Sequence, residues 1–289
     1  MSLINGNNNC LSVCAFLLPV YGGDKAIFFR RALESIFAQS APSIPIRVYL
    51  GIDGPIDGTL ETVVKEFSPR IYKIIRSPIR RGVARNLNAL ISVLEDESFV
   101  FRMDADDVCL PNRVSLQLKY LNRHPEIGIL GGAIQEIDPD GRNYGIRTYP
   151  QCGKVKDYIR YASPLAHPTV VFRREILNLL GGYPLSGFNE DIQMWFAALA
   201  KGIEIDNLTE TILLYQVNNG FYNRRSYIKA FGEAKAYIVG NFRLHGISLA
   251  LLLPVLRLIF RLMPGRIVRV LYHTLPLRRI LLNTDSGKR

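Results

Sequence analysis

The first hundred residues alternate short apolar runs with stretches of helical periodicity. The apolar runs have the length of strands buried on both faces of a sheet; they cover residues 11–18, 46–52, 72–75 and 99–103. Between them, apolar side chains recur every three or four positions, which predicts helices; these stretches are residues 28–37, 60–67 and 83–95. Strands that alternate with helices predict an α/β fold with a mostly parallel central sheet and flanking helices.

The second half of the chain is less regular. Residues 138–141, with the sequence Asp-Pro-Asp-Gly, favour a tight turn and predict a hairpin between residues 133–137 and 143–148. Residues 163–172 indicate a loop followed by a strand, and residues 191–200 indicate a helix. The sequence contains no internal repeat and no low-complexity linker.

We expect one main domain over residues 1–240, with halves at about residues 10–110 and 111–240, and a helical, amphipathic, basic tail at residues 241–289. The formal net charge is +11, and residues 248–289 carry eight basic residues and one acidic residue. The longest uncharged run there, about thirteen residues, is too short to span a bilayer. The tail therefore predicts an in-plane anchor on an anionic membrane surface, with a helical hairpin packed on the domain as the alternative.

Composition is ordinary for a folded protein, with 48% hydrophobic and 21% charged residues. The four cysteines form no Cys-x-x-Cys pair, which predicts reduced thiols and a cytoplasmic protein. The N-terminus has no basic region, and its first apolar run is expected to be a core strand rather than a signal peptide. Because the excess positive charge lies in a tail that is as apolar as it is basic, we expect a membrane surface rather than a nucleic acid as its partner.

Three carboxylates, those of Asp104, Asp106 and Asp107, stand directly after the apolar run that ends at residue 103. They repel one another, and hard divalent cations such as Mg²⁺ and Mn²⁺ prefer oxygen ligands. The cluster therefore predicts either a metal site or a solvated acidic turn. An EF-hand is excluded, because the sixth loop position is not Gly and the twelfth is not Glu.

Other residues with candidate chemistry also stand at predicted strand ends. Pro19, Val20 and Tyr21 end the first run, and Asp53 follows the second. Ligands of parallel sheets bind at the carboxyl ends of the strands, so we expect these residues to line one rim together with Asp104. Asp53 could instead form a turn, because Asp-Gly-Pro is favourable turn chemistry, and Tyr21 could belong to the core.

Six blocks of the chain stand in a fixed order: Leu17-Leu18-Pro19-Val20-Tyr21, Gly51-Ile52-Asp53-Gly54-Pro55, Arg81-Gly82-Val83-Ala84-Arg85-Asn86-Leu87-Asn88, Asp104-Ala105-Asp106-Asp107 with Leu110-Pro111-Asn112-Arg113, His167-Pro168-Thr169-Val170 with Gly181-Gly182-Tyr183, and Glu190-Asp191 with Met194-Trp195. Together they resemble the family 2 glycosyltransferases, nucleotide-sugar enzymes with the GT-A fold. The resemblance covers about residues 11–225. The Asp-Gly-Pro turn and the sequence Tyr-Asn-Arg-Arg at residues 222–225 are similar to the bacterial surface-polysaccharide subgroup (O-antigen, capsule and exopolysaccharide).

The resemblance implies a donor site. Asp106 would be the direct metal ligand, with Asp104 contacting the ribose or the metal, and Mn²⁺ or Mg²⁺ would be the cofactor. The residues expected at the nucleotide sugar are Pro19, Val20, Tyr21, Asp53, Arg85, Asp104, Arg224 and Arg225; the three arginines could instead be solvated surface charges. Gly22 and Arg80 depart from the family pattern, which has Asn at both positions.

The resemblance also implies a catalytic pair, Glu190 and Asp191. Asp191 would be the general base that accepts the proton of the acceptor hydroxyl, and Glu190 would orient the acceptor or share the role of the base. Both acids could instead stabilise a helix N-terminus, where negative charge is favourable. By the same argument, Asp107 could cap the helix that begins near Pro111.

Three further residues are candidate acceptor contacts: His167, Gly182 and Trp195. His167 precedes a proline in a loop and could be structural, and Trp195, the only tryptophan, is expected to favour core packing over sugar stacking. A binding role for either therefore competes with an ordinary packing role.

The resemblance and the basic tail together imply an inverting, metal-dependent glycosyltransferase that acts in bacterial surface-polysaccharide synthesis. It would move glucose or galactose from a UDP-sugar to a hydroxyl of a glycan on a polyprenyl diphosphate carrier, at the cytoplasmic face of the membrane. One alternative is a nucleotidyl- or phosphoryl-transferase using the same carboxylates, although no Gly-x-x-x-x-Gly-Lys-Ser/Thr loop is present. The other is a basic membrane-binding protein without catalytic activity.

Overall fold

The computed structural model describes most of the predicted domain. The described residues are 13–40, 44–151, 153–185, 189–217 and 227–262. Arg224 and Arg225, and the part of the basic tail beyond residue 262, lie outside the described residues.

Four parallel strands form the first half of the sheet, in the order β3-β2-β1-β4. Their bounds are Cys14–Tyr21 (β1), Ile46–Asp53 (β2), Lys73–Ser77 (β3) and Phe99–Arg102 (β4). Successive side chains of a strand point to opposite faces, so Phe16 and Leu18 pack into one core and Ala15 and Leu17 into another. Apolar side chains are therefore needed at nearly every position of β1.

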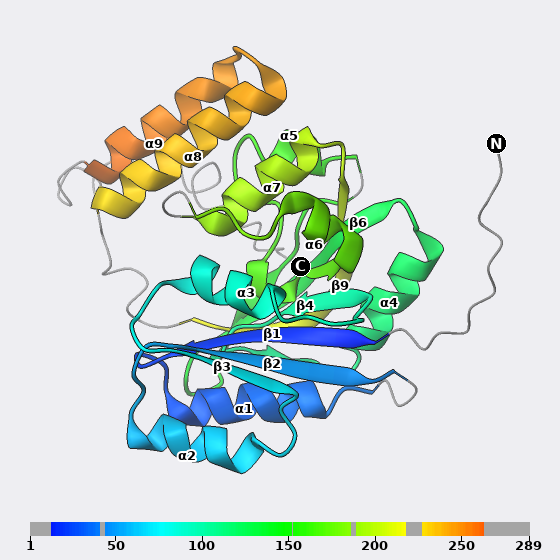
Figure 1. Cartoon of the computed structure of the whole chain (residues 1–289). Coiled ribbons are helices and arrows are strands. Elements are labelled where there is room, and N and C mark those ends of the chain that lie inside the picture. Colours follow the sequence, from blue (N-terminus) through cyan, green and yellow to red (C-terminus); the bar gives the residue numbers. More distant parts are fainter. Residues whose placement is uncertain (1–12, 41–43, 152, 186–188, 218–226, 263–289) are drawn as a thin grey trace.

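Helices cover both faces of these strands. In Figure 1, α1 (Ala26–Phe37) and α2 (Gly58–Phe67) lie on one face and α3 (Val83–Ile91) lies on the other. The helix α3 ends earlier than predicted, because the N–H groups of Val93 and Leu94 bond to carbonyls three residues back and tighten the chain. This α/β arrangement confirms the predicted fold class.

The second half of the sheet is mixed rather than parallel, in the order β8-β6-β9-β5 with β7 paired to β6. The bounds are Val108–Cys109 (β5), Ile127–Ile137 (β6), Asn143–Arg147 (β7), Val171–Arg173 (β8) and Glu204–Gln216 (β9). The strand β8 is antiparallel to both β4 and β6, whereas β6 and β9 run parallel. The antiparallel pairing of β6 with β7 confirms the predicted hairpin.

Four helices connect or follow these strands: α4 (Arg113–Arg123), α5 (Val155–Tyr158), α6 (Arg174–Leu180) and α7 (Glu190–Ala200). A 3-10 turn, His167–Thr169, precedes β8. The helix α7 begins one residue before the predicted start, and the acidic pair of the sequence occupies its first turn.

The C-terminal part of the described chain is a helical hairpin of α8 (Tyr227–His245) and α9 (Leu252–Leu262). In Figure 1, α8 packs on α7 and α9 packs on α8 as the outermost layer. The expected tail boundary after residue 240 falls inside α8, so the hairpin begins before it. Among the described helices, none combines the length and hydrophobicity that crossing a membrane requires.

Candidate active site

The predicted residues meet at the carboxyl ends of the parallel strands. Tyr21 at the end of β1 is in register with Asp53 at the end of β2. The chain leaves β4 at Arg102, and the N–H of Met103 still bonds to the carbonyl of Leu17 on β1 at 3.1 Å. The acidic cluster therefore emerges on the same rim as Tyr21 and Asp53, as the strand order requires.

Two buried arginines support the acidic loop. The guanidinium of Arg102 forms a two-pronged ion pair with the carboxylate of Asp104. Arg113, at the start of α4, donates a hydrogen bond to the carbonyl of Arg102 at 2.9 Å and is fully buried beside the stacked rings of Phe16 and Phe101. These two arginines thereby hold the acidic loop in place on its buried side, and its carboxylates lie at the rim.

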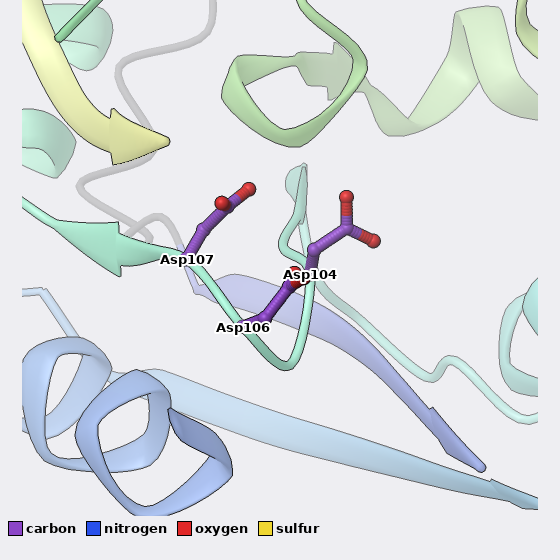
Figure 2. Close-up of side chains that lie close together, drawn as sticks. All are labelled: Asp104, Asp106 and Asp107. Atoms are coloured by element: carbon purple, nitrogen blue, oxygen red, sulfur yellow. The ribbon is translucent and has the colours of Figure 1, made fainter. Parts of the chain in front are cut away.

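The three carboxylates lie together at the turn (Figure 2). One oxygen from each of Asp104, Asp106 and Asp107 lies within 4.8 Å of the other two. The Oδ1 atom of Asp107 accepts a hydrogen bond from the N–H of Gln216 on β9 at 2.9 Å, and its buried Oδ2 has no partner among the described residues. The predicted helix cap was wrong, because Asp107 is bound to β9 and Asn112 occupies the N-cap of α4.

Burial and mutual repulsion make this cluster a poor place for uncompensated charge. Burial, followed by the charge of Asp104, raises the pKa of Asp106 to about 6. The same causes raise the pKa of Asp107 well above its usual value. Burial also raises the pKa of Asp24, just after β1, to about 7, with further contributions from Asp106 and Asp104. A cation at this position would relieve the repulsion between the carboxylates.

The donor set fits a hard divalent cation. It consists of carboxylate oxygens only, and one of them, Oδ2 of Asp107, is buried without a hydrogen bond from a described residue. Oxygen ligands suit Mg²⁺ and Mn²⁺. Asp24 was missed by the sequence reasoning, although its position three residues after Tyr21 places it on the same rim.

The ring of Tyr21 is neither in the core nor open on both faces. The guanidinium of Arg80 lies over the ring at 4.1 Å from its centroid, and Gly23 lies so close that a Cβ there would come within 2.3 Å of a ring carbon. The departure at Arg80 from the family pattern thus supplies a cation to this tyrosine. A stacking contact between Tyr21 and a base stays a prediction that requires Arg80 to move aside.

Asp53 holds the turn that starts α3. Its two oxygens accept hydrogen bonds from the N–H groups of Arg81 at 2.7 Å and Gly82 at 2.8 Å. Arg85, one turn further, is exposed and reaches back toward the carbonyl of Arg81. These hydrogen bonds hold the turn at residues 81–82 and not the Asp-Gly-Pro turn that the sequence favoured. Direct contact of Asp53 or Arg85 with a nucleotide remains a prediction.

The remaining two residues of the first block contribute unequally to the rim. Val20 is 1% exposed and packs in the core, so only its backbone can border a ligand. Pro19 is half-buried. The strand end thus offers the rim mainly backbone groups and the side chain of Tyr21.

The acidic pair opens α7. Asn189 precedes it in the left-handed conformation, with φ of 61°, and makes no side-chain cap hydrogen bond. Burial, followed by the charge of Glu190, raises the pKa of Asp191 to about 6, and the N–H of Ile192 opposes this shift by bonding to the carboxylate. The place of Asp191 in the first turn of α7 agrees with the helix-start interpretation. Its role as the general base stays a prediction, and the raised pKa is compatible with it.

An aromatic cluster separates the acidic pair from the metal carboxylates. His167 Nε2 lies 2.9 Å from the hydroxyl of Tyr183, and Phe172 stacks on Trp195 with ring centroids 6.0 Å apart. Trp195 is fully buried, so its prediction as an acceptor contact was wrong and the core interpretation is confirmed. Burial, followed by the charge of Arg102, lowers the pKa of His167 well below its usual value, so its imidazole is neutral.

Two asparagines of α3 were also missed. Asn86 Nδ2 donates to the carbonyl of Gly51 on β2 at 2.8 Å, and Asn88 bonds to both backbone groups of Tyr183. Gly182, a predicted acceptor contact, touches Asn88 instead: a Cβ at Gly182 would lie 2.5 Å from Asn88 Oδ1. Only the pairing partners seen in the tertiary structure reveal these roles.

Comparisons with known proteins identify the family of this chain. Residues 16–180 match the family model of glycosyl transferase family 2. An uncharacterized glycosyltransferase of Haemophilus influenzae is 30% identical over 272 residues, which cover 89% of this chain and 97% of that protein. The UDP-Gal:alpha-D-GlcNAc-diphosphoundecaprenol beta-1,3-galactosyltransferase of Escherichia coli is 27% identical over 226 residues, 76% of this chain and 80% of that protein.

Solved structures share the fold at low sequence identity. TarS of S. aureus (residues 1–349) in complex with UDP-GlcNAc superposes with a TM-score of 0.63 at 16% identity, over 92% of this chain and 77% of that one. The mannosyltransferase PcManGT of Pyrobaculum calidifontis in complex with GDP-Man and Mn²⁺ gives a TM-score of 0.59 at 16% identity, over 92% and 80%. The sheet described above is thus that of the GT-A enzymes.

The family model spans the parallel strands from residue 16 onward and the acidic loop, and it ends at residue 180, directly before the Gly-Gly turn. The Haemophilus relative aligns over nearly the whole chain. This chain therefore belongs to glycosyl transferase family 2 and is a glycosyltransferase.

Proposed function

We propose that this glycosyltransferase is inverting and metal-dependent, and that it moves glucose or galactose from a UDP-sugar to a hydroxyl of a polyprenyl-diphosphate-linked glycan. One observation carries the proposal: residues of the acidic loop and of the acidic pair both lie close enough to the buried Tyr183 to act on its hydroxyl. The hydroxyl pKa of Tyr183 is raised mainly by burial, and it responds to Arg102 and Asp104 of the loop as well as to Asp191 and Glu190 of α7. A donor bound at the acidic loop and an acceptor bound at Asp191 would therefore be close to each other.

Asp106, Asp104 and Asp107 would hold the divalent cation. When bound, it supplies Lewis-acid stabilisation of the charge on the departing diphosphate. Other residues of the protein orient these carboxylates. Arg102 orients Asp104 through both terminal nitrogens of its guanidinium, and Gln216 orients Asp107 through its backbone N–H.

Asp191 would act as the general base. Its carboxylate accepts the proton from the acceptor hydroxyl, whose oxygen forms a bond to the anomeric carbon of the donor as the bond from that carbon to the diphosphate oxygen breaks. The nucleoside diphosphate leaves with the electron pair of the broken bond. Attack from the face opposite the leaving group inverts the anomeric centre. A base with a pKa raised to about 6 is ionised at neutral pH and still basic enough to accept the proton.

UDP is the proposed nucleotide because both the E. coli galactosyltransferase and the S. aureus neighbour carry it in their names. Its diphosphate would lie between the acidic loop and the first turn of α3. That turn presents exposed Arg81 and Arg85 beside N–H groups oriented by Asp53. Arg224 and Arg225 remain proposed partners of the same phosphates.

The name of the E. coli relative also supports a polyprenyl-linked acceptor, and the outer face of the helical hairpin supports a membrane as the place of reaction. Apolar side chains on α9 point away from α8: Leu252 is 57% exposed, Leu256 59% and Ile259 47%. In the connection before α9, Ile247 and Leu249 are more than four-fifths exposed. We propose that this face binds the cytoplasmic surface of the cell membrane as a peripheral anchor.

A groove between α7 and α8 adds to this apolar surface. It has a volume of about 690 Å³ and is lined mainly by small and apolar side chains, within the roughly 300–1,000 Å³ of ordinary ligand sites. Among the described residues, the charged side chains that line it are those of Lys235 and Arg243, and none of the lining residues is acidic. An anionic amphiphile suits this apolar and basic lining. The basic tail of the chain suits it less well, because its charge has the same sign as that of the lining.

A panel of nucleotide sugars tests the proposed function. Binding is measured by thermal shift on the full chain, with and without Mn²⁺, and product configuration by NMR. We expect one UDP-hexose to raise the melting temperature only when Mn²⁺ is present, and the product to have the inverted anomeric configuration. A metal-independent shift, a retained configuration, or a response to nucleoside triphosphates alone would contradict the proposal.

A further inference from the structure

The helix α3 is tied to three separate parts of the molecule. At its start, the N–H groups of Arg81 and Gly82 bond to Asp53. In its middle, Asn86 bonds to the carbonyl of Gly51 on β2. Near its end, Asn88 bonds across to the segment that leads into the catalytic half. Of the three ties, only the last crosses from the nucleotide half to the half that carries α7.

The Asn88 contact is a two-bond clamp. Nδ2 of Asn88 donates to the carbonyl of Tyr183 at 2.8 Å, and the N–H of Tyr183 donates to Oδ1 of Asn88 at 2.7 Å. Paired bonds of opposite direction fix both the distance and the orientation of a backbone segment. Gly182 makes this approach possible, because its φ is +83° and any Cβ would collide with Asn88 Oδ1.

The clamped residue, Tyr183, lies within electrostatic range of both charged groups of the site. Tyr183 is 3% exposed, and its hydroxyl bonds to His167, whose ring in turn contacts Trp195 of α7 at a centroid distance of 6.0 Å. The chain runs from Tyr183 to the start of α7 within seven residues. A displacement of Tyr183 can therefore reach the helix of Asp191 through the contacts of Tyr183 with His167 and of His167 with Trp195.

We propose that Asn88 is a positioning residue that couples occupation of the nucleotide site to the placement of Asp191. The inference rests on the proposed function, because it takes the start of α3 as the nucleotide contact. Arg85 and Asn88 are three residues apart and thus neighbours on one helix surface. A small movement of α3 toward a bound nucleotide is then transmitted by the clamp to Tyr183 and to the first turn of α7.

The chain offers a matched pair of variants, Asn88→Ala and Asn86→Ala. Each removes a side-chain amide that bonds to a backbone group, from positions two residues apart on α3. Only Asn88→Ala breaks the connection to Tyr183. Asn88→Asp serves as a second variant, because it retains the acceptor for the N–H of Tyr183 but loses the donor to its carbonyl.

Trp195 provides a readout that does not depend on knowing the acceptor. It is the only tryptophan of the chain and lies fully buried on α7 against His167 and Phe172. Donor affinity is measured by calorimetry with UDP-sugar and Mn²⁺, and Trp195 emission is followed during the same titration. We expect the donor to change the emission in the wild type and in Asn86→Ala. In Asn88→Ala the change should be lost, although the donor still binds within about threefold of its normal affinity.

Steady-state kinetics give the second readout. Asn88→Ala should lower kcat by about tenfold or more with little change in the KM for the donor, because positioning acts on the reacting complex. Asn88→Asp should show an intermediate loss. A purely structural role would instead lower donor affinity, kcat and melting temperature together in both alanine variants.

The following results would contradict the proposed role of Asn88. Unchanged emission on donor binding in the wild type, a retained response in Asn88→Ala, or equal losses in both alanine variants would overturn the coupling. If calorimetry shows that no nucleotide sugar binds the wild type, the proposed function fails first, and this outcome is distinct from binding without coupling.

Discussion

The candidate site differs from the rest of the rim in that its carboxylates, those of Asp191 and Asp106, are largely buried from solvent. Burial is the first cause of the raised pKa of Asp191 and of Asp106, and a neighbouring carboxylate is the second in both. Ionised carboxylates in such surroundings lower the stability of the folded protein. Proteins keep such groups mainly where function needs them. Each of the two can therefore be tested by removing the charge while keeping the shape.

Replacing Asp191 by Asn should lower kcat by about 10²–10⁴-fold while donor binding stays intact, since the base is lost and the nucleotide site is not. In the wild type, kcat should rise with pH through about 6, the value to which the pKa of Asp191 is raised. A pH profile of kcat, read beside calorimetric donor affinity, measures both. Normal turnover by Asp191→Asn would show that another group is the base.

The same substitution should change stability with a definite sign. The folded state raises the pKa of Asp191 from 3.8 to about 6, so it binds the proton more tightly than the unfolded chain, and stability falls as pH rises across that interval. Asp191→Asn should therefore raise the free energy of unfolding at pH 7.5 by about 1 kcal/mol, after allowance for solvent screening. Urea denaturation at pH 4 and 7.5 checks this, and a gain of equal size at both would contradict it.

Asp106→Asn should separate metal binding from folding. Without metal, the variant should be more stable than the wild type by about 1 kcal/mol at neutral pH, because one buried like charge is gone. With Mn²⁺ and a nucleotide sugar, it should lose the ligand-induced thermal shift. Glu126→Gln, an exposed acid on another part of the surface, is the control. Destabilisation of Asp106→Asn in the absence of metal would show that its charge is compensated by the protein.

At the scale of elements, the contact between the helix α3 and the Gly-Gly turn connects the nucleotide half of the domain to the half that carries α7. Gly181 and Gly182 follow α6 with φ of +73° and +83°. A side chain at Gly181 would meet nothing within 4 Å, whereas one at Gly182 would meet Asn88. The pair thus separates backbone strain from loss of the clamp.

Gly181→Ala should cost about 1 kcal/mol in free energy of unfolding, which is the strain of the left-handed region alone. Gly182→Ala should cost about 2–3 kcal/mol, because the strain is joined by the displacement of Asn88 from its two hydrogen bonds. Urea denaturation of both variants gives the difference. Equal costs would show that Asn88 yields without loss.

At the scale of the whole molecule, the helical hairpin places an apolar surface on the outside of a basic protein. Its residues on α9 point away from α8, and they are followed in sequence by six more basic residues beyond residue 262. A surface with both properties favours an anionic bilayer, since apolar burial and charge attraction then act together.

Changing Leu252, Leu256 and Ile259 to Ser should reduce sedimentation of the full chain with phosphatidylglycerol-containing vesicles by about tenfold or more, because each loses apolar burial. Added salt should weaken the remaining binding. Changing Tyr144 and Ile146 of β7 to Ser is the control, since these side chains are about equally exposed elsewhere. Equal vesicle binding by all three proteins would exclude α9 as the anchor.

Much of the donor half could be predicted from the sequence. Strands buried on both faces need apolar residues throughout, and this pattern correctly identified β1, β2 and β4. Their carboxyl ends then had to meet, which placed Tyr21, Asp53 and Asp104 on one rim. In the second half the hairpin of β6 and β7 was predicted, but the antiparallel direction of β8 was not, because β8 is only three residues long and carries too little pattern to reveal its direction.

The fold class, the shared rim and the carboxylates could be inferred from the amino-acid sequence, because hydrophobic periodicity and the positions of the strands along the chain are local features. The pairing of the polar atoms became known from the folded molecule. There Asp107 pairs with β9, Asp53 with the turn of α3 and Asn88 with Tyr183. These assignments depend on residues up to about a hundred positions apart, and a polar group must find its partner wherever folding brings one, since burial without a partner costs free energy.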